Sequence, residues 1–460
     1  MTTELFSTLP LSPAMLANLD SLGYKSMTPI QAQSLPTVLA GRDLIAQAKT
    51  GSGKTAAFGI GLLNRINPRW FAVQALVLCP TRELADQVSK EIRRLARAFD
   101  NIKVLTLCGG ATMRPQMASL EHGAHIVVGT PGRILDHLER GSLDLAGLQT
   151  LVLDEADRMV DMGFYDDIAK VVKACPAERQ TLLFSATYPD TIRQQSARFL
   201  RNPAEVVVES QHDDSKIQQR FFEVAPEQRL ATVAKLLKHY RPVSSIAFCN
   251  TKQQCRDLVD LLRAEGFTAL ALFGELEQRE RDQVLVQFAN RSCSVLVATD
   301  VAARGLDIQS LEAVINVDLT RDPEVHVHRI GRTGRGDEQG IALSLVTPAE
   351  MFRVEAIENY QRRPVEWGTM AELNTSGKPL TPPMVTLQIL GGRKEKIRPG
   401  DVLGALTGEA GIPGAQVGKI AVFDFSTYVA VERGIAPQAL ARLNAGKLKG
   451  KSVKARFLED

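Results

Sequence analysis

The sequence has no long apolar run, no paired cysteines and no strong excess of charge of either sign. None of its hydrophobic stretches approaches the roughly 20 residues that a membrane-spanning helix needs, so we expect no membrane association. The six cysteines form no CxxC pair, which favours buried free thiols over a zinc site or disulfides. The segment Met1–Pro10 lacks the basic start, apolar core and cleavage site of a secretory signal. We therefore expect a cytoplasmic protein.

What remains is the composition of a globular protein with an uneven charge distribution. Hydrophobic residues make up 44% and charged residues 23% of the 460 positions, and this length suits two or three domains. The net charge is +3 overall, but residues 384–460 contain 12 Lys or Arg and 7 Asp or Glu, a net +5 that leaves −2 for the rest. A basic terminal domain predicts contact with a polyanion, although a solvated basic face gives the same count.

Short apolar runs alternate with helical patterns through most of the chain. The clearest runs cover residues 75–79, 125–128, 150–153, 181–184, 245–249, 294–298 and 313–317. Nearly continuous hydrophobicity is typical of parallel strands that crossover helices bury on both faces. The pattern predicts an α/β architecture with ligands beyond the carboxyl ends of the strands.

Breaks in this pattern divide the chain into three domains. We expect a first α/β domain over 1–208, a linker over 209–216, a second α/β domain over 217–363, a Pro-rich tether over 364–383 and a small domain over 384–460. The small domain shows strand signals at 385–390, 420–423, 426–431 and 452–458, and helix signals at 399–410 and 437–444. This β-α-β-β-α-β order predicts an α+β sandwich of the RNA-recognition type.

Two motifs point to a nucleoside triphosphate and magnesium. A glycine-rich turn before a lysine and a hydroxyl can cradle phosphates and bind Mg²⁺; its residues are Ala48, Lys49, Thr50, Gly51, Ser52, Gly53, Lys54 and Thr55. The second motif, Asp154-Glu-Ala-Asp157, ends a buried apolar run, where carboxylates need a cation. We expect Asp154 and Thr55 to hold the metal and Glu155 to polarise the attacking water. Alone, the quartet fits an acidic helix start; with the first motif it indicates an NTPase.

Taken with further motifs, residues 1–360 resemble the DEAD-box RNA helicases. The motifs that carry this resemblance are Gly23–Gln31, the P-loop, Pro80–Ala85, Gly109-Gly110, Thr130–Arg133, the acidic quartet, Ser185–Thr187, Gln278–Arg281, Ala298–Asp307 and His328–Arg335. The resemblance implies two tandem RecA-like parallel-sheet domains, ATP and Mg²⁺ as cofactors and RNA as partner. It also implies RNA-stimulated ATP hydrolysis and the local unwinding of short duplexes.

The resemblance assigns further roles around the nucleotide. Gln31, whose amide can both donate to and accept from adenine, would contact the base together with Tyr24 and Phe6, and Asp307 would contact the ribose. The second domain would contribute the catalytic side chains His328, Arg332 and Arg335, the two arginines acting as fingers on the transferring phosphoryl group. The residues that would couple hydrolysis to strand separation are Asp157, Ser185 and Thr187.

The contacts to RNA that the resemblance implies use hydroxyls, amides and guanidiniums, which bind phosphates without reading bases. The matching positions are Thr81, Arg82, Gly110, Thr130, Arg133, Gln278, Arg281 and Thr299. A motor of this kind is blind to sequence, so it needs another element to deliver it to its substrate.

The basic terminal domain is the candidate for delivery. Ser426 stands where a stacking aromatic is expected, and 385–390 contains none, which disfavours base stacking on the sheet. Binding is expected instead from loops around Arg393–Arg398 and from a basic edge made of Lys447, Lys449, Lys451, Lys454 and Arg456. The domain order resembles the bacterial DbpA-type helicases, whose tail recognises a hairpin of large-subunit (23S) ribosomal RNA. Structured ribosomal RNA and ribosome assembly are the implied partner and role.

Two other functions would use the same residues. An ATP-dependent clamp or scaffold would close on RNA and unwind little. A DNA helicase of the same superfamily is disfavoured by Gln31 and by the acidic quartet. We expect the protein to act as a monomer.

Overall fold

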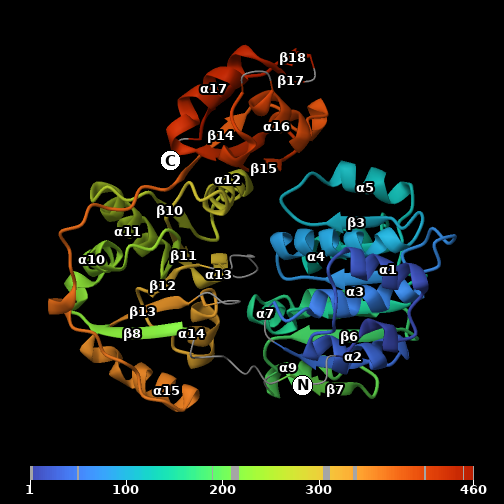
Figure 1. The fold of residues 1–460 in the computed structure, drawn as a ribbon. Coiled ribbons are helices and arrows are strands. Elements are labelled where there is room, and N and C mark those ends of the chain that lie inside the picture. Colours follow the sequence, from blue (N-terminus) through green and yellow to red (C-terminus); the bar gives the residue numbers. More distant parts are fainter. Residues whose placement is uncertain are drawn as a thin grey trace. The chain divides into compact units, whose positions relative to one another are not determined.

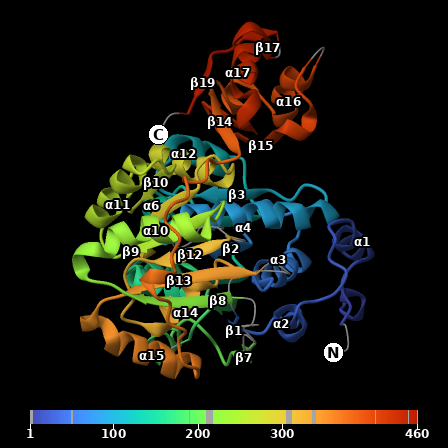
Figure 2. The same ribbon diagram turned by 60° about the vertical axis from the view of Figure 1, so that its left-hand side comes forward.

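The computed structural model describes residues 4–48, 51–188, 190–208, 217–303, 311–334, 339–408, 411–448 and 450–458. It divides into two compact units, Met1–His212 and Asp213–Asp460, each of which is described by itself (Figures 1 and 2). Among the helices in these ranges, none has both the length and the apolar character that crossing a bilayer requires.

The first unit contains a seven-stranded parallel sheet in the order β3-β4-β2-β5-β6-β1-β7. Its strands are β1 (Leu44–Gln47), β2 (Ala75–Leu78), β3 (Val104–Leu107), β4 (Ile126–Gly129), β5 (Thr150–Asp154), β6 (Gln180–Ser185) and β7 (Ala204–Val207). The four apolar runs predicted in this part of the chain are strands, because each is buried on both faces.

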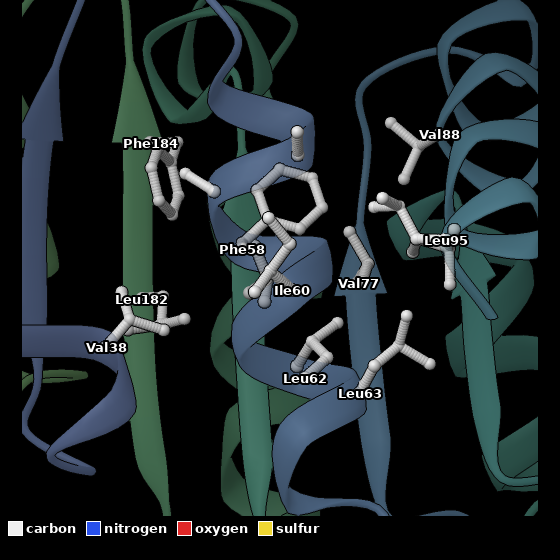
Figure 3. Packing of buried hydrophobic residues seen from close by; sticks show 14 of the residues in the cluster. Val38, Phe58, Ile60, Leu62, Leu63, Val77, Val88, Leu95, Leu182 and Phe184 are labelled. Atoms are coloured by element: carbon white, nitrogen blue, oxygen red, sulfur yellow. The ribbon is translucent and has the colours of Figure 1, made fainter. Parts of the chain in front are cut away.

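Helices cover both faces of this sheet. They are α1 (Pro13–Ser21), α2 (Pro29–Leu39), α3 (Lys54–Arg65), α4 (Arg82–Leu95), α5 (Met113–Glu121), α6 (Pro131–Glu139), α7 (Ala156–Asp161), α8 (Tyr165–Ala174) and α9 (Asp190–Ser196). Figure 3 shows the core between α3 and the strands, where Phe58 packs on Phe184 with ring centroids 5.3 Å apart. Burying one such side chain stabilises the fold by about 1.5–3 kcal/mol. This core fixes the start of α3 against the ends of β1 and β6.

The second unit begins with a six-stranded parallel sheet in the order β10-β11-β9-β12-β13-β8. Its strands are β8 (Ile217–Glu223), β9 (Ser245–Cys249), β10 (Ala269–Leu272), β11 (Val295–Thr299), β12 (Ala313–Asn316) and β13 (Gly340–Val346). Its helices are α10 (Arg229–Tyr240), α11 (Lys252–Ala264), α12 (Gln278–Ala289), α13 (Asp300–Ala303), α14 (Pro323–Ile330) and α15 (Met351–Gln361). The predicted linker at 209–216 lies outside the described residues.

The Pro-rich segment 364–383, expected to be a tether, lies along the edge of the second sheet. Phe221 on the edge strand β8 donates to the Glu366 carbonyl and accepts from the Gly368 nitrogen, both at 2.8 Å. Further along, Arg241 donates to the Lys378 carbonyl at 2.7 Å. The segment thus covers backbone groups that an edge strand would otherwise present.

The C-terminal domain has the predicted β-α-β-β-α-β order with one short hairpin added. Its elements are β14 (Met384–Ile389), α16 (Pro399–Thr407), β15 (Val417–Val422), β16 (Thr427–Glu432), α17 (Ala436–Ala445), β17 (Lys447–Leu448), β18 (Lys451–Ser452) and β19 (Ala455–Phe457). The antiparallel sheet has the order β15-β16-β14-β19, and α16 and α17 pack on one face. The predicted last strand starts too early, because Ser452 pairs with Lys447 in the hairpin. The predicted fold class, two parallel-sheet α/β domains and a small α+β domain, is confirmed.

Candidate nucleotide and RNA site

Three strands that carry motifs end side by side in the first sheet. In the order β5-β6-β1, Asp154 ends β5, Ser185 ends β6, and the P-loop follows β1. The registers pair Asp154 with Phe184 and Gln47 with Ser185, so the three ends lie at one edge. The carboxyl edge of a parallel sheet is where such folds bind ligands.

The P-loop is a tight turn that leads into α3. Gly51 and Gly53 have φ values of 80° and 96°, which glycine adopts without strain. A Cβ on Gly53 would lie 2.5 Å from the side-chain nitrogen of Gln31, so a larger residue there would displace the Gln31 amide. Lys54 begins α3, and its buried ammonium donates to the Ala48 carbonyl at 2.5 Å. The amides at the start of a helix, next to a lysine, favour bound phosphate.

Asp154 is a buried carboxylate with an unsatisfied oxygen. The residue is 3% exposed, and its Oδ1 atom has no hydrogen-bond partner. Burial, reinforced by the negative charge of Glu155 and opposed by the positive charge of Lys54, raises the pKa of Asp154 from 3.8 to about 7. The hydroxyl of Ser52 in the P-loop is also buried without a partner. Such groups are stabilised when a cation or a polar ligand binds beside them.

These donors fit the predicted magnesium ion. Asp154 offers a carboxylate oxygen and Thr55, in the first turn of α3, offers a hydroxyl, and Mg²⁺ prefers hard oxygen ligands. In the described part of the chain, no group of three or more His, Cys, Asp or Glu side chains could hold a metal. The other ligands of a magnesium ion here would therefore be water and phosphate oxygens, as is usual for this metal at nucleotides.

Glu155 lies in a strained backbone conformation. Its φ of 54° and ψ of 52° place it in the left-handed region, which costs a non-glycine residue roughly 1–3 kcal/mol and is often found at functional sites. Its carboxylate forms an ion pair with Arg158, and both side chains are largely buried. Sequence reasoning overlooks Arg158, although an acid and a base three positions apart on a helix are a detectable signal.

The last residue of the acidic quartet joins the ends of two strands. Asp157 accepts hydrogen bonds from the backbone nitrogen and the hydroxyl of Thr187, each at 3.0 Å. Its own backbone nitrogen donates to the Ser185 hydroxyl at 3.2 Å. The three predicted coupling residues therefore form one hydrogen-bonded group.

The predicted adenine contacts come from the start of the first unit: Phe6 precedes α1, Tyr24 lies between α1 and α2, and Gln31 is in α2. The Gln31 amide accepts from the Thr28 nitrogen at 2.9 Å and donates to the Gly53 carbonyl at 3.1 Å, so it links α2 to the P-loop. Phe6 and Tyr24 pack edge to face with ring centroids 6.2 Å apart. Phe6 belongs to the main core of the first unit, and Tyr24 packs against that core.

The RNA positions predicted in the first unit follow the other half of its sheet. In the order β3-β4-β2, Gly110, Thr130 and Thr81 stand just beyond the strand ends. Thr81 caps α4 with its hydroxyl, and Arg82 begins that helix. Arg133 donates to a loop carbonyl at 3.0 Å. The sheet edge is thus divided between predicted nucleotide residues and predicted RNA residues.

The RNA positions predicted in the second unit meet at the ends of two adjacent strands. Gln278 and Arg281 form the first turn of α12, which follows β10, and Thr299 ends β11. Arg281 donates to the Ala302 carbonyl on α13 at 2.9 Å. These side chains therefore share the carboxyl edge of the second sheet.

A buried arginine holds the segment that carries the predicted catalytic residues of the second unit. His328 is exposed on the last turn of α14, and Arg332 follows that helix. Between them, Arg329 donates through two nitrogens to Asp300, each at 2.7 Å, and to the Asp318 carbonyl at 2.7 Å. Such bidentate pairs impose a fixed geometry. The sequence places Arg329 in the arginine-rich motif but does not reveal its structural role, because its partners lie 29 and 11 positions away.

The outer face of the C-terminal sheet packs on the second domain. Thr386 of β14 is buried, and its hydroxyl bonds to Asn290 at 3.1 Å and to Ser292 at 2.7 Å, just after α12. The buried Tyr428 of β16 accepts from Gln283 of α12 at 3.3 Å. Bases cannot stack on a face that is covered in this way, which agrees with the prediction against base stacking.

The predicted basic edge is described only in part. Lys447 and Lys454 are exposed, whereas Arg456 donates to the buried Gln388 at 2.9 Å. The side chain of Lys451 is not described. The predicted site residues that lie outside the described residues are Lys49, Thr50, Asp307, Arg335 and Lys449.

Comparisons with known proteins agree with this geometry. Residues 28–195 match the model of the DEAD/DEAH box helicase family, 228–337 the helicase conserved C-terminal domain and 386–457 the DbpA RNA binding domain. The chain is 53% identical to the ATP-dependent RNA helicase DbpA of Escherichia coli, with 99% of both chains covered. It is 44% identical to the DEAD-box ATP-dependent RNA helicase CshA of Geobacillus kaustophilus, over 80% of this chain and 78% of that protein.

A solved structure extends the likeness to the fold. Saccharomyces cerevisiae Dbp5 bound to RNA and ADP BeF3 is 31% identical and superposes with a TM-score of 0.71, covering 80% of this chain and 95% of that one. The two parallel-sheet domains are therefore RecA-like. The chain belongs to the DEAD-box family of ATP-dependent RNA helicases, which hydrolyse ATP, and it carries a DbpA-type RNA-binding domain.

Proposed function

We propose that this helicase locally unwinds short RNA duplexes in the cytoplasm, as a monomer, and that its C-terminal domain directs it to structured 23S ribosomal RNA during ribosome assembly. The observation that carries the target is the match of residues 386–457 to the DbpA RNA binding domain, within a full-length likeness to DbpA. The exposed Lys447 and Lys454 support contact with a polyanion.

The residues at the first sheet edge would divide the work of hydrolysis. Asp154 and Thr55 would hold Mg²⁺, which offsets charge on the phosphates. Glu155 would orient the attacking water, and Lys54 would leave the Ala48 carbonyl for the phosphates. The hydrogen bonds of Asp157 would pass the nucleotide state to the loop after β6.

The second unit would complete the site only when the two RecA-like domains close. Arg332 and Arg335 would stabilise charge on the transferring phosphoryl group, as arginine fingers do, with His328 beside them. Asp307 would contact the ribose. Closure on ATP would also bring the two sets of backbone-binding residues onto one RNA strand, and so displace its partner locally.

Strand displacement tests this function directly. The substrate is a short duplex joined to a hairpin fragment of 23S ribosomal RNA, compared with the same duplex without the hairpin. We expect ATP-dependent displacement of the first substrate to be faster, and the difference to disappear when residues 384–460 are deleted. If all RNAs stimulated ATP hydrolysis by the full-length protein equally, targeting would be contradicted.

Strand displacement and the stimulation of ATP hydrolysis together separate the alternatives. A protein that binds both RNA strands tightly with ATP but displaces neither is a clamp. Hydrolysis that responds to DNA and not to RNA would contradict an RNA helicase altogether.

A further inference from the structure

The C-terminal domain must bind RNA away from its outer sheet face, because the second domain covers that face. The buried Thr386 and Tyr428 are bonded to residues of α12 and of the turn after it. The opposite face packs on α16 and α17. The remaining candidates are the edges and the loops that connect the strands.

One such loop holds two phenylalanines in opposite environments. Phe423 and Phe425 flank the tip of the β15–β16 hairpin. The ring of Phe423 packs edge to face on Tyr428 with centroids 5.5 Å apart. Phe425 is 72% exposed, whereas Phe423 is half-buried. An exposed ring at a fixed position is a surface on which a nucleic-acid base can stack.

The backbone holds a basic turn, Arg393–Arg398, directly against this hairpin tip. Arg393 and Lys394 donate through their backbone nitrogens to the carbonyls of Phe423 and Asp424, at 2.8 and 3.0 Å. A Cβ on Gly392 would lie 2.1 Å from the Phe423 carbonyl oxygen. The two loops therefore touch backbone to backbone, which holds the basic turn beside the exposed ring.

The charges of this corner favour an anion. The basic turn contains four cationic residues, all of them exposed: Arg393, Lys394, Lys396 and Arg398. Two of the nearby carboxylates are used to cap backbone nitrogens, since Glu395 accepts from Gly392 and Asp401 accepts from Arg398, each at 2.7 Å. A third, Asp424, lies 3.7 Å from Arg393, and both side chains are more than half exposed, so this ion pair is weak.

We propose that Phe425 and the basic turn Arg393–Arg398 form an RNA subsite, in which one unpaired base stacks on the Phe425 ring while the cations bind the phosphates beside it. The inference rests on the proposed RNA-binding role of the C-terminal domain. It adds a stacking position that the sequence pattern of the sheet does not contain.

Fluorescence anisotropy with a labelled 23S ribosomal RNA hairpin that has a single-stranded flank tests the subsite, using full-length protein without ATP. Phe425→Leu keeps an apolar side chain but removes the ring, and should raise Kd by roughly 5- to 100-fold. Phe425→Tyr should restore the wild-type affinity. Arg393→Gln should weaken binding and lower the salt dependence of log Kd by about one unit of slope.

Phe352 supplies a matched control. It is 64% exposed on α15 of the second domain, so Phe352→Leu should leave Kd unchanged. If Phe425→Leu binds as tightly as wild type while deletion of 384–460 weakens binding, the stacking subsite is wrong and the role of the domain stands. If that deletion also has no effect, both are wrong. An equal loss in Phe425→Tyr and Phe425→Leu would likewise overturn stacking.

Discussion

Buried polar groups behave differently at the nucleotide edge of the first domain and on the outer face of the C-terminal sheet. At the nucleotide edge, the Asp154 Oδ1 atom and the Ser52 hydroxyl have no partner. On the C-terminal sheet, Thr386 and Tyr428 are equally buried, but both are hydrogen-bonded to the second domain. In the described part of residues 384–460, no buried side-chain nitrogen or oxygen is left unsatisfied.

The difference separates a ligand site from a structural contact. Leaving a buried polar group unpaired costs about 1–3 kcal/mol, so the nucleotide edge is stabilised further when a ligand binds. The C-terminal face has nothing comparable to gain, because its partners are already in place. Substitutions of the same kind should therefore have opposite effects on stability at the two places.

The largest effect is expected on hydrolysis at the nucleotide edge. Glu155→Gln keeps the shape of the side chain but removes the charge that polarises water, and should lower RNA-stimulated turnover by roughly 10²–10⁴-fold. ATP affinity should stay nearly unchanged, since Lys54 and the P-loop amides remain. Steady-state hydrolysis and fluorescent-nucleotide titration measure the two quantities. Turnover close to wild type would show that another group activates the water.

Thr386→Val should destabilise the C-terminal interface. The change keeps the side-chain volume but leaves Asn290 and Ser292 without their partner hydroxyl, at a cost of about 1–3 kcal/mol. Hydrogen exchange should become faster in β14 and at the end of α12. Thr407→Val is the matched control, because the half-buried Thr407 hydroxyl donates to the Leu403 carbonyl of its own helix at 2.9 Å, and the change should alter exchange at neither place.

Asp154→Asn should act in the opposite direction on stability. It removes a buried charge that the nearby Lys54 compensates only in part, so the nucleotide-free first domain should become more stable by about 1–2 kcal/mol, while turnover is lost. Denaturant unfolding without nucleotide measures the change. A destabilised variant would mean that the carboxylate is already satisfied, and the comparison between the two regions would fail.

His326 is expected to have a smaller effect on stability. It also shows that a buried polar atom without a hydrogen-bond partner does not by itself make a ligand site. Its Nδ1 atom is buried without a partner, but burial, reinforced by the charge of Arg329, lowers the pKa of His326 from 6.5 to about 3, so the ring is neutral. Besides Arg329, it faces the Gln219 amide at 3.5 Å and the Phe221 ring.

The neutral ring makes the second domain sensitive to acid. The unfolded chain takes up a proton at His326 below pH 6.5 and the folded one does not, so the free energy of unfolding should fall by about 1.4 kcal/mol per pH unit as pH decreases from there. Stability at pH 6.5 and pH 5 measures this slope. His326→Gln should remove it, and an equal slope in both proteins would place the titration elsewhere.

The local parts of this site could be predicted from the sequence. A glycine turn before Lys54 and carboxylates after an apolar run each carry their chemistry within a few residues, and parallel strands bring such ends to one edge. The pairing of Arg329 with Asp300 and that of Thr386 with Asn290 could not, because each joins segments far apart in the chain. Ser452 was misplaced because a short hairpin and the start of a strand look alike in a polar, lysine-rich stretch.

The cover of β8 by residues 364–383 determines where the protein can be shortened. Cutting after residue 363 would remove the segment that bonds to Phe221 and expose an unpaired strand, which invites pairing between copies and precipitation. A truncated protein that ends near residue 380 keeps this protection. The natural end of the motor therefore lies some way beyond the last helix of its second domain.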